Sequence, residues 1–347
     1  MKHIFLLPAL LLFAIIAHAQ TIKGKVTDAE TGKPIAGASV YLNGTFVGTV
    51  TDTLGVFMLT TNKTTIPLVV SYVGYTTHQI SNYAGVDLQI MMTRKPTELD
   101  EVTVTADAMS RANKMRIFLT EFLGASTDCY IENPGDVWLH YSKNTEELTG
   151  GADKPLIIHN KKLGYKITYY LSSFRHVPTQ TAYEGNYIFA EDTAGLKRSA
   201  MKQLLKDRDE AYYGSRMHFI RALWADQLAK NTFDIYHPMP KAGGAAAGDK
   251  PGISQLSYND LVAVKSNAIF HDQKFIVLKD EVSVNYQRSR DVRELSYLQL
   301  AANSAGAMID ADGNYGEGIE WRGDMGHSRV NKLLPFEFQP VVKRDKR

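Results

Sequence analysis

The sequence predicts two folded parts behind an export signal: an all-β sandwich of about seven strands over residues 20–106 and an α+β domain over residues 107–347. Three observations predict this division. Residues 1–19 read as a cleaved signal, residues 20–106 alternate with a period of two, and helical periods begin only after residue 107. A chain of 347 residues is long enough for about two domains, each with its own core.

The first 19 residues predict export. Lys2 and His3 precede an apolar run over residues 4–16, and Ala17-His18-Ala19 is a small-x-small cleavage site. The apolar run is shorter than the about 20 residues that a membrane-spanning helix needs. We therefore expect a signal that is cleaved before Gln20, and no transmembrane segment in the mature chain.

Net charge and cysteine content limit the partners and the covalent cross-links that this protein can have. The formal charge of +2 is too small to indicate a nucleic-acid partner or a charged membrane surface. The single cysteine, Cys129, excludes an internal disulfide, so the exported fold must depend on core packing. We expect Cys129 to be a small buried side chain, because no pattern around it indicates a nucleophile.

The first domain reads as short strands joined by tight turns. Ile22 and Val26 share one face of an extended segment, and Lys23 and Lys25 share the other. The Asn43-Gly44 dipeptide predicts a tight hairpin turn, and a second turn is expected at residues 52–55. Further strands are expected at residues 38–42, 46–51, 56–60, 67–73, 86–93 and 101–105.

The second domain mixes both periods. An amphipathic helix is expected at 111–123, and a longer one at 209–230 with a kink near residues 214–215. The Gly- and Ala-rich residues 241–252 predict a loop. Strands are expected at residues 137–141, 155–159, 165–171, 181–190, 268–271, 274–278, 281–286 and 294–301, and residues 326–340 should be mostly irregular.

Four motifs in the first domain carry a family resemblance: residues 24–28, 31–40, 51–57 and 71–75. Together they resemble the carboxypeptidase-regulatory-like domain, a transthyretin-like sandwich of exported Bacteroidota proteins. In that family Gly55 and Phe57 would serve the turn and the core. The resemblance implies a structural or docking module without chemistry of its own.

The segment Leu99–Ala106 resembles the junction that joins this domain to a plug and barrel in TonB-dependent outer-membrane receptors. The residues after Ala106 are too few for a barrel of about 22 strands. We expect Val102 and Val104 to be inward residues of a last strand. A strand that pairs with the sheet edge of a partner protein is the alternative.

Residues 115–340 resemble a second Bacteroidota domain that often follows the regulatory-like sandwich. The resemblance rests on residues 133–134, 155–160, 163–169, 208–223 and 334–335. It implies no established activity, and therefore no catalytic roles.

The motifs of common enzymes are missing from the sequence. No histidine begins a zinc-peptidase pattern, and there is no Gly-x-Ser-x-Gly elbow or phosphate-binding glycine loop. Asp310, Asp312 and Asn314 alternate as in calcium loops, but Tyr315 and Trp321 stand where an EF-hand needs Gly and Glu. We expect a plain turn there, and no catalytic, cofactor-binding or metal-binding residues.

The densest polar cluster in the sequence lies on or beside the longer helix. Arg208, Tyr212, His218 and Arg221 are the candidate binding residues, because His218 and Arg221 lie three residues apart on one helix face. A hydrogen-bonded packing surface is the alternative. An aromatic-rich region could also bind a sugar or a protein, or simply pack; it comprises Trp138, Tyr141, Tyr165, Tyr169, Tyr170, Tyr183 and Tyr187.

These features favour an exported binding or scaffolding protein, located in the periplasm or at the outer membrane. We expect a protein partner in the envelope; a glycan or a peptide is the alternative ligand. The rival function is a hydrolase acting on peptide or glycan, with the sandwich as an accessory domain. A His–carboxylate pair in a deep pocket of residues 107–347 would favour the hydrolase.

Overall fold

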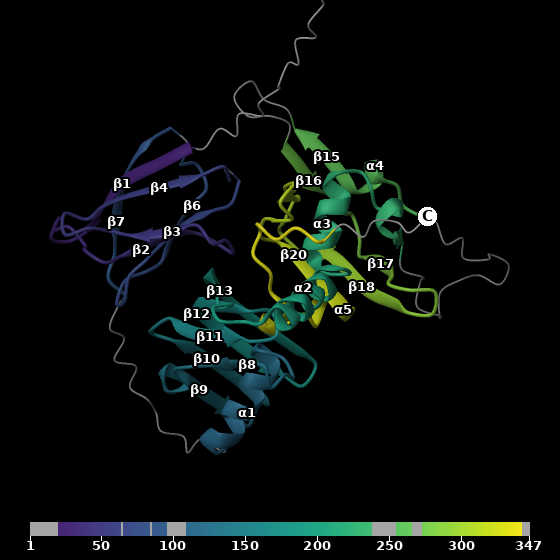
Figure 1. Ribbon diagram of the computed structural model, residues 1–347, viewed down its shortest axis with the longest axis horizontal. Coiled ribbons are helices and arrows are strands. Elements are labelled where there is room, and N and C mark those ends of the chain that lie inside the picture. The colour runs from purple at the N-terminus through teal and green to yellow at the C-terminus, as the bar shows by residue number, and fades with distance from the viewer. Residues whose placement is uncertain are drawn as a thin grey trace, which may run out of the picture.

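The computed structural model describes residues 20–63, 65–83, 85–95, 109–237, 255–265 and 273–341. Three hydrophobic cores hold these residues together: one in the sandwich, one between α1 and a large central sheet, and one around α3. Figure 1 shows the sandwich at the upper left, the central sheet below it, and the third group at the right. The predicted fold class, a sandwich followed by an α+β part, is confirmed.

The sandwich consists of two sheets. One has the order β4-β1-β7 and the other the order β3-β2-β5-β6. The strands are β1 (Gln20–Asp28), β2 (Ser39–Leu42), β3 (Gly48–Val50), β4 (Val56–Thr61), β5 (Leu68–Ser71), β6 (His78–Ile80) and β7 (Asp87–Met92). Pairing is antiparallel as expected, except that β7 runs parallel to β1. The strand expected at residues 101–105 lies outside the described residues, and β6 was not predicted.

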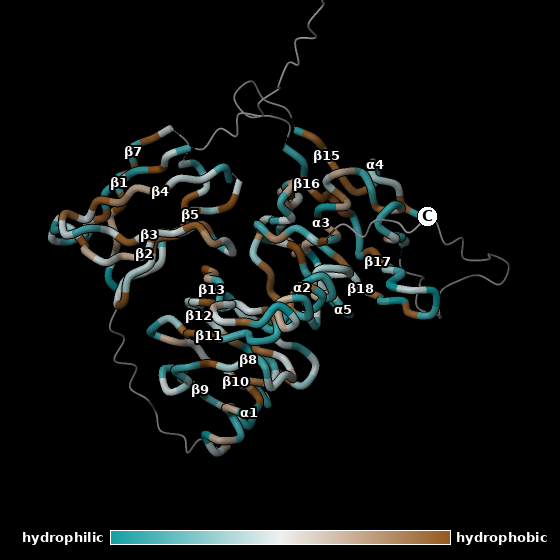
Figure 2. The backbone as a smooth tube through the Cα atoms, viewed as in Figure 1, coloured by the Kyte–Doolittle hydropathy of each residue, from teal (hydrophilic) through white to brown (hydrophobic). Residues whose placement is uncertain are grey.

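Alternation along the strands explains the sandwich core. Ile22 and Val26 are 1% and 0% exposed, while Lys23 and Lys25 between them point outward. Gly24 lies where a Cβ would approach the Leu88 carbonyl to 2.6 Å, so a larger residue would push β7 away. Figure 2 shows hydrophobic and hydrophilic residues alternating along these strands.

The central sheet has the order β8-β11-β12-β10-β9, and β13 pairs with the other edge of β12. Helix α1 (Arg111–Phe122), predicted from its periodicity, packs Phe118 and Phe122 into the core of this sheet. The strands are β8 (Cys129–Ile131), β9 (Val137–Ser142), β10 (Glu147–Ala152), β11 (Leu156–Asn160), β12 (Tyr165–Val177) and β13 (Gln180–Glu191).

The long helix predicted at residues 209–230 is two helices, α2 (Arg198–Tyr212) and α3 (Arg216–Trp224). The chain does more than kink near residue 214: Gly214 takes a φ of +84° and ends the helical path. Ser215 then caps α3, its side chain accepting a hydrogen bond from the His218 amide at 3.1 Å. A Cβ on Gly214 would approach Glu294 to 2.4 Å and Tyr286 to 2.8 Å, so packing against β17 and β18 holds this break.

The third group surrounds α3 with two small sheets, ordered β14-β17-β18-β20 and β15-β16-β19. Its strands are β14 (Phe233–Tyr236), β15 (Val262–Lys265), β16 (Gln273–Ile276), β17 (Val282–Gln287), β18 (Arg293–Leu300), β19 (Ala307–Ile309) and β20 (Ile319–Arg322). The short helices are α4 (Tyr258–Leu261), α5 (Gly323–Gly326), η1 (Pro134–Asp136), η2 (Ala229–Asn231) and η3 (Val330–Lys332). The predicted loop at 241–252 and strand at 268–271 lie outside the described residues.

Candidate functional site

The sandwich packs on the rest of the chain through the outer face of its sheet β3-β2-β5-β6. Tyr41 and Val69 point away from the sandwich core, yet they are 1% and 0% exposed. The Tyr41 ring stacks on Tyr170 of β12, with ring centroids 5.3 Å apart. Gln79 of β6 donates a hydrogen bond to Asn186 of β13 at 2.9 Å. The β12–β13 hairpin therefore covers this face of the sandwich.

The turn between β2 and β3 is bound by backbone hydrogen bonds on both sides. The Gly44 amide donates to the Tyr187 carbonyl of β13 at 2.8 Å, and the Phe189 amide donates to the Thr45 carbonyl at 2.9 Å. On the other side, the Phe336 amide donates to the Gly44 carbonyl at 2.9 Å. The turn is thus hydrogen-bonded to β13 on one side and to the C-terminal segment on the other.

Gly44 is required at this position for two reasons. Its φ of +73° lies in the left-handed region, but the tight two-residue hairpin that Asn43-Gly44 predicts does not form, because the φ of Asn43 is not positive and residues 43–47 connect β2 to β3. A Cβ would also lie 2.7 Å from the Phe336 ring, closer than real side chains approach. Asn43 adds a further contact, because its side-chain oxygen accepts a hydrogen bond from the Tyr187 amide at 2.9 Å. The residues that predict a local turn therefore also make contacts between distant parts of the chain.

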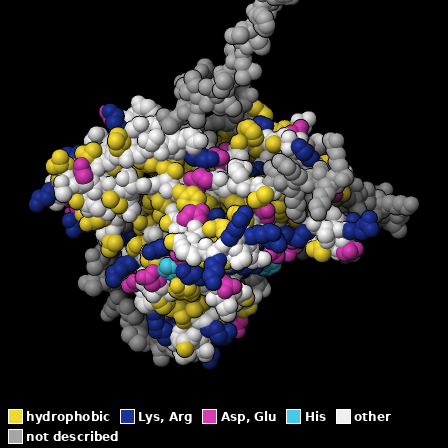
Figure 3. Space-filling view, viewed as in Figure 1, with side chains coloured by type: hydrophobic (Ala, Val, Ile, Leu, Met, Phe, Trp, Pro, Cys, Tyr) yellow, Lys and Arg dark blue, Asp and Glu magenta, His cyan; other side chains and the backbone are white. Residues whose placement is uncertain are grey.

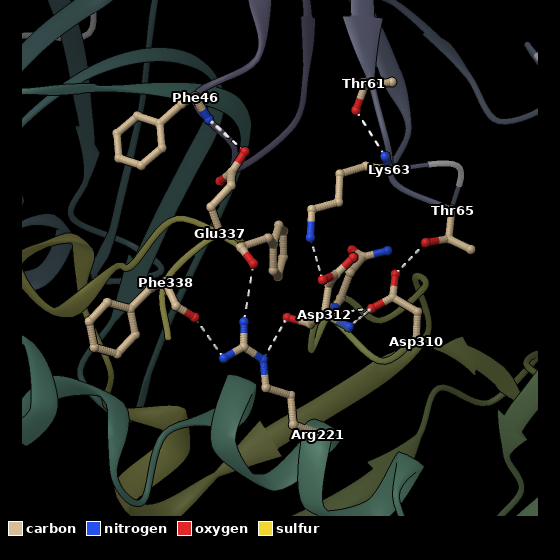
Figure 4. A network of polar contacts seen from close by, with 11 residues as sticks. Phe46, Thr61, Lys63, Thr65, Arg221, Asp310, Asp312, Glu337 and Phe338 are labelled. Carbon is tan, nitrogen blue, oxygen red and sulfur yellow. Dashed lines mark hydrogen bonds and ion pairs between the residues drawn. The ribbon is translucent and has the colours of Figure 1, made fainter. Parts of the chain in front are cut away.

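Polar side chains hold the loop after β4 against the loop after β19. The Lys63 ammonium pairs with the Asp312 carboxylate, and the Thr65 hydroxyl donates to Asp310 at 2.6 Å (Figure 4). Both acceptors belong to the segment that the sequence indicated as a plain turn. Asp310 also accepts from the amides of Asp312 and Asn314, both at 2.9 Å. The carboxylates of Asp310 and Asp312 are thus both engaged by protein donors.

Arg221 and Glu337 complete the junction. The Arg221 guanidinium donates to the carbonyls of Asp312 at 2.9 Å, Phe338 at 2.8 Å and Phe336 at 3.1 Å (Figure 4). One Glu337 oxygen accepts from the Phe46 amide of the sandwich at 3.1 Å. Arg221 therefore fixes the two segments against which the sandwich rests.

Burial raises the pKa of both acidic side chains at the junction, Asp310 and Glu337. It raises the pKa of Asp310, which is 6% exposed, despite the hydrogen bonds from Thr65 and Asn314. It likewise raises the pKa of Glu337, although the Phe46 amide opposes the shift. The second Glu337 oxygen, Oε2, is buried and has no hydrogen-bond partner among the described residues. A charge on Glu337 is therefore poorly compensated.

Arg208 has different partners from the other candidate binding residues. Its guanidinium donates to the Leu163 carbonyl at 2.8 Å and pairs with Glu191 of β13, also at 2.8 Å. It lies 3.9 Å from the centre of the Tyr165 ring, a cation–π contact. These contacts hold α2 against the central sheet.

Tyr212, His218 and Arg221 do come together. The ring centroids of Tyr212 and His218 are 4.9 Å apart, and Arg221 lies over the Tyr212 ring at 5.4 Å. His218 Nδ1 accepts from the Gly214 amide at 3.2 Å, which assigns the proton to Nε2, 3.1 Å from the Asn231 side-chain oxygen. Burial lowers the pKa of His218 to about 4, so the ring is neutral at neutral pH.

The side-chain nitrogens of Arg208, His218 and Arg221 have hydrogen-bond partners within the chain, and Tyr212 makes ring contacts. His218 is 2% exposed and both of its ring nitrogens are engaged, so it has no nitrogen free for proton transfer. This geometry fits the packing interpretation better than an open groove. A ligand-binding role for Arg208, Tyr212, His218 and Arg221 stays a prediction.

A His–carboxylate arrangement occurs elsewhere, on the central sheet. His159 Nδ1 lies 3.2 Å from Asp192, and Nε2 lies 3.0 Å from Glu132. The hydrogen bond from His159 lowers the pKa of Glu132, and bonds from Lys161 and His159 lower that of Asp192. Because carboxylates occupy both ring nitrogens, the cluster resembles a surface ion-pair network more than a general base. No group of His, Cys, Asp and Glu within the described ranges is arranged to hold a metal ion.

Cys129 is buried in the central sheet. It is 5% exposed, and burial raises the pKa of its thiol to about 12. Most of the aromatic-rich region is buried too: Tyr165, Tyr169, Tyr183 and Tyr187 contribute to the same core. Trp138, which is 48% exposed, is an exception.

A groove of about 330 Å³ opens where the sandwich meets the central sheet. Tyr72, Tyr75 and Lys95 line it from the sandwich, and Tyr170 and Asp153 line it from the other side. Tyr72 is 38% exposed, and its ring lies 5.6 Å from that of Tyr75. The groove therefore offers an aromatic face together with hydroxyl and charged groups.

The outer face of the other sandwich sheet is exposed. On β4 and β7, Val56, Met58 and Met91 are 43%, 68% and 64% exposed. Between them on β1 lie Lys23, which pairs with Asp87 at 3.0 Å, and Lys25. Figure 3 shows hydrophobic and basic side chains interspersed on the sandwich surface. We call Lys23, Lys25, Val56, Met58 and Met91 the open face.

Sequence reasoning did not identify the junction: it singled out Arg221, Asp310 and Asp312, but not their contacts with one another or with the sandwich. Asn43 and Gly44 gave a turn signal, which is local and does not indicate what the turn touches. Lys63 and Asp312 lie 249 residues apart, and no spacing rule connects them. Co-variation between such positions is the signal that could reveal the contact.

The fold and the junction together define a class of protein: a β-sandwich module docked on an α+β body. Residues 22–104 match the family model of the CarboxypepD_reg-like domain. This match confirms the resemblance that the sequence motifs carry.

One curated relative matches in the same N-terminal region. It is the TonB-dependent receptor SusC of Bacteroides thetaiotaomicron, 34% identical over 116 residues. The match covers 33% of this chain and 11% of the relative, so the chain spans about a tenth of that protein's length.

A crystal structure from Bacteroides fragilis, of a membrane-associated protein of unknown function, aligns with 88% of this chain and 95% of its own. The identity is 13% and the TM-score is 0.18, too low for an argument about fold. Within the described ranges, the helices are all too short or too polar to cross a membrane.

Proposed function

We propose that this chain is an exported binding or scaffolding protein of the bacterial envelope, and that its sandwich is the docking module. One observation carries the proposal: one outer face of the sandwich is buried and the other is exposed to solvent. The face with Tyr41 and Val69 is buried against the body, while Met58 and Met91 of the open face are more than half exposed. A module fixed on one side and apolar on the other is suited to hold a partner.

The predicted signal and the receptor relative both support the compartment that we propose. We propose that residues 1–19 are removed, that residues 20–106 form the sandwich domain and that residues 107–347 form the second domain. The TonB-dependent receptor that shares the N-terminal region supports a place in the envelope, in the periplasm or at the outer membrane.

The open face suggests the chemistry of the partner. Methionine and valine side chains provide apolar area, and methionine adapts its shape to the surface it meets. Lys25 has no acidic neighbour opposite it, because the flanking residues in the register are Val56 and Gln89. We therefore propose a protein partner with apolar residues beside an acidic one.

Site-specific photo-crosslinking tests this proposal. A photoreactive residue would replace Met91 or Lys25 on the open face, and Lys143 in the β9–β10 turn of the body as a control. We expect a discrete protein adduct in the native cell envelope from the first two positions and none from Lys143. Absence of an adduct, or equal labelling from all three positions, would contradict the proposal.

If the crosslinking fails, the hydrolase becomes the leading function. A peptide or glycan would then be sought in the groove between the sandwich and the central sheet, since the exposed Tyr72 ring could stack on such a ligand. Binding of peptide and glycan arrays to wild type and to Tyr72→Ala separates the two ligand classes, and turnover on the same arrays tests for an enzyme.

A further inference from the structure

Strand β4 is an edge strand whose outward backbone groups can be assigned from its neighbours. The Val56 amide and carbonyl point away from β1, because they bond to the Asp52 carboxylate at 2.8 Å and the Asp52 amide at 2.9 Å. In an antiparallel pair, successive residues point alternately toward and away from the partner strand. The amides and carbonyls of Met58 and Thr60 therefore also point away from β1.

These four groups are unpaired within the part of the chain that the structure describes. Met58 and Thr60 take part in no backbone or side-chain hydrogen bond there apart from the β1–β4 pairing. Edge strands are normally protected from pairing with other chains by a charge, a proline or a bulge. Residues 55–62 contain no charged residue and no proline, and the β1–β4 register is regular over six pairs.

The remaining edge strands of the sandwich differ from β4. β7 carries Asp87, which pairs with Lys23 at 3.0 Å. β3 and β6 have three residues each and offer little length for pairing. β4 is thus the sandwich edge that combines length with the absence of charge.

We propose that β4 pairs antiparallel with β4 of a second copy of this chain, around a two-fold axis. Placing Met58 opposite Thr60 of the partner makes two hydrogen-bonded pairs and uses all four free groups on each strand. The result is a continuous sheet through both sandwiches, in the order β7-β1-β4 and then β4-β1-β7.

A second copy fits because the edge is complementary to itself. An uncharged strand meets no like charge when it pairs with its own copy. The nearest lysines, Lys23 and Lys25, lie one strand further in. Three strand spacings separate them from their counterparts by at least about 14 Å, which is beyond the screening length at physiological salt.

Exposed apolar residues near the edge add area to the contact. Val50 on β3 is 61% exposed, and Leu54 in the turn before β4 is 65% exposed. A strand pair with a few flanking side chains is at the small end of specific interfaces. We therefore expect a reversible dimer whose population rises with protein concentration.

Sedimentation velocity of the mature chain from Gln20 tests the dimer. Wild type should shift from monomer to dimer over about a hundredfold range of concentration, and Met58→Lys should remain monomeric, because lysine protects an edge strand. Met91→Lys is the matched control: it makes the same change on the open face but away from this edge, and should still dimerise. A wild-type chain that stays monomeric, or two variants that behave alike, would overturn the proposal.

A disulfide test fixes the register. Chains carrying Met58→Cys and chains carrying Thr60→Cys, both with Cys129→Ser, are mixed and oxidised under mild conditions. Hydrogen-bonded neighbours lie about 5.5 Å apart between Cα atoms, within the range for a disulfide. We expect the mixed disulfide to form well before either chain links to itself. Equal rates for the mixed and self-linked products would contradict this pairing.

The dimer does not rest on the proposed function. It uses the backbone edge of β4, whereas the crosslinking positions Met91 and Lys25 lie on the sheet face. Failure of one experiment therefore leaves the other unaffected.

Discussion

The two outer faces of the sandwich are built from the same kind of strand, yet one is buried and the other is exposed. The buried face carries Tyr41 and Val69, and the open face carries lysine, valine and methionine. Gly48 shows how close the buried contact is, since a Cβ there would lie 2.4 Å from the Ile188 methyl. Alternation predicts which residues leave the core, but not whether another surface covers them. That second property depends on the rest of the chain.

The largest effect is expected from removing the central aromatic contact. Tyr41→Ala should destabilise the protein by about 3–5 kcal/mol, because it opens a cavity beneath Tyr170. Met91→Ala on the open face should change stability by less than about 0.5 kcal/mol. Urea unfolding of both variants measures the contrast. Similar losses would mean that the open face is covered as well.

Tyr41→Phe sharpens this comparison. The Tyr41 hydroxyl is buried, and its interaction with the nearby Ser71 hydroxyl falls short of hydrogen-bond geometry. Removing it should therefore be neutral or slightly stabilising. A clear loss would show that the hydroxyl has a partner in solution.

The turn at Gly44 should give the next largest effect. Gly44→Val must adopt a φ of +73° and also clash with Phe336, whereas Gly32→Val meets a φ of +67° with no atom within 4 Å. Backbone strain should lower the free energy of unfolding of both variants by about 1–3 kcal/mol. The clash should lower that of Gly44→Val by about 1–3 kcal/mol more. Thermal unfolding of the pair isolates the contact; equal shifts in Tm would argue against the docked turn.

Arg221→Ala separates packing from binding. The variant leaves three carbonyls of the junction without their donor and should lose about 2–4 kcal/mol. Circular dichroism melting provides the measurement. An unchanged Tm with loss of binding to a ligand would instead establish the groove predicted around Arg208, Tyr212, His218 and Arg221.

A smaller effect is expected from pH. Burial raises the pKa of Glu337 above its ordinary value of 4.5, so the folded protein holds this proton more strongly than the unfolded chain. The resulting stability is complete below pH 4.5 and is lost as the pH rises through the folded pKa. Glu337→Gln should therefore gain in Tm relative to wild type as the pH rises.

Comparing the two proteins at each pH cancels the contribution of His218. Its lowered pKa acts in the opposite sense, destabilising both proteins as the pH falls below 6.5. A Tm difference that stays constant from pH 4 to 8 would show that Glu337 is not buried as a charge.

Local features of the fold were predictable from the sequence. The period of two located β1, β2 and β4, and the Asn43-Gly44 dipeptide located a turn. The break at Gly214 was predicted only as a kink, because its cause lies in Tyr286 and Glu294, far along the chain. The four candidate binding residues stood out as polar, but the sequence does not reveal that carbonyls of residues 312, 336 and 338 engage Arg221. Contacts with distant residues decide whether a polar side chain is hydrogen-bonded within the chain or free to bind a ligand. The spacing of residues in a single sequence does not reveal those contacts.

The bonds to Phe336 and Glu337 also impose an order on folding. The sandwich is synthesised first and has its own hydrophobic core, so it can form while the rest of the chain is still emerging. Its docking surface, however, includes Phe336 and Glu337, and Glu337 follows its partner Phe46 by 291 residues. Docking must therefore be a late step, and until then Tyr41 and Val69 are exposed to any other protein in the compartment.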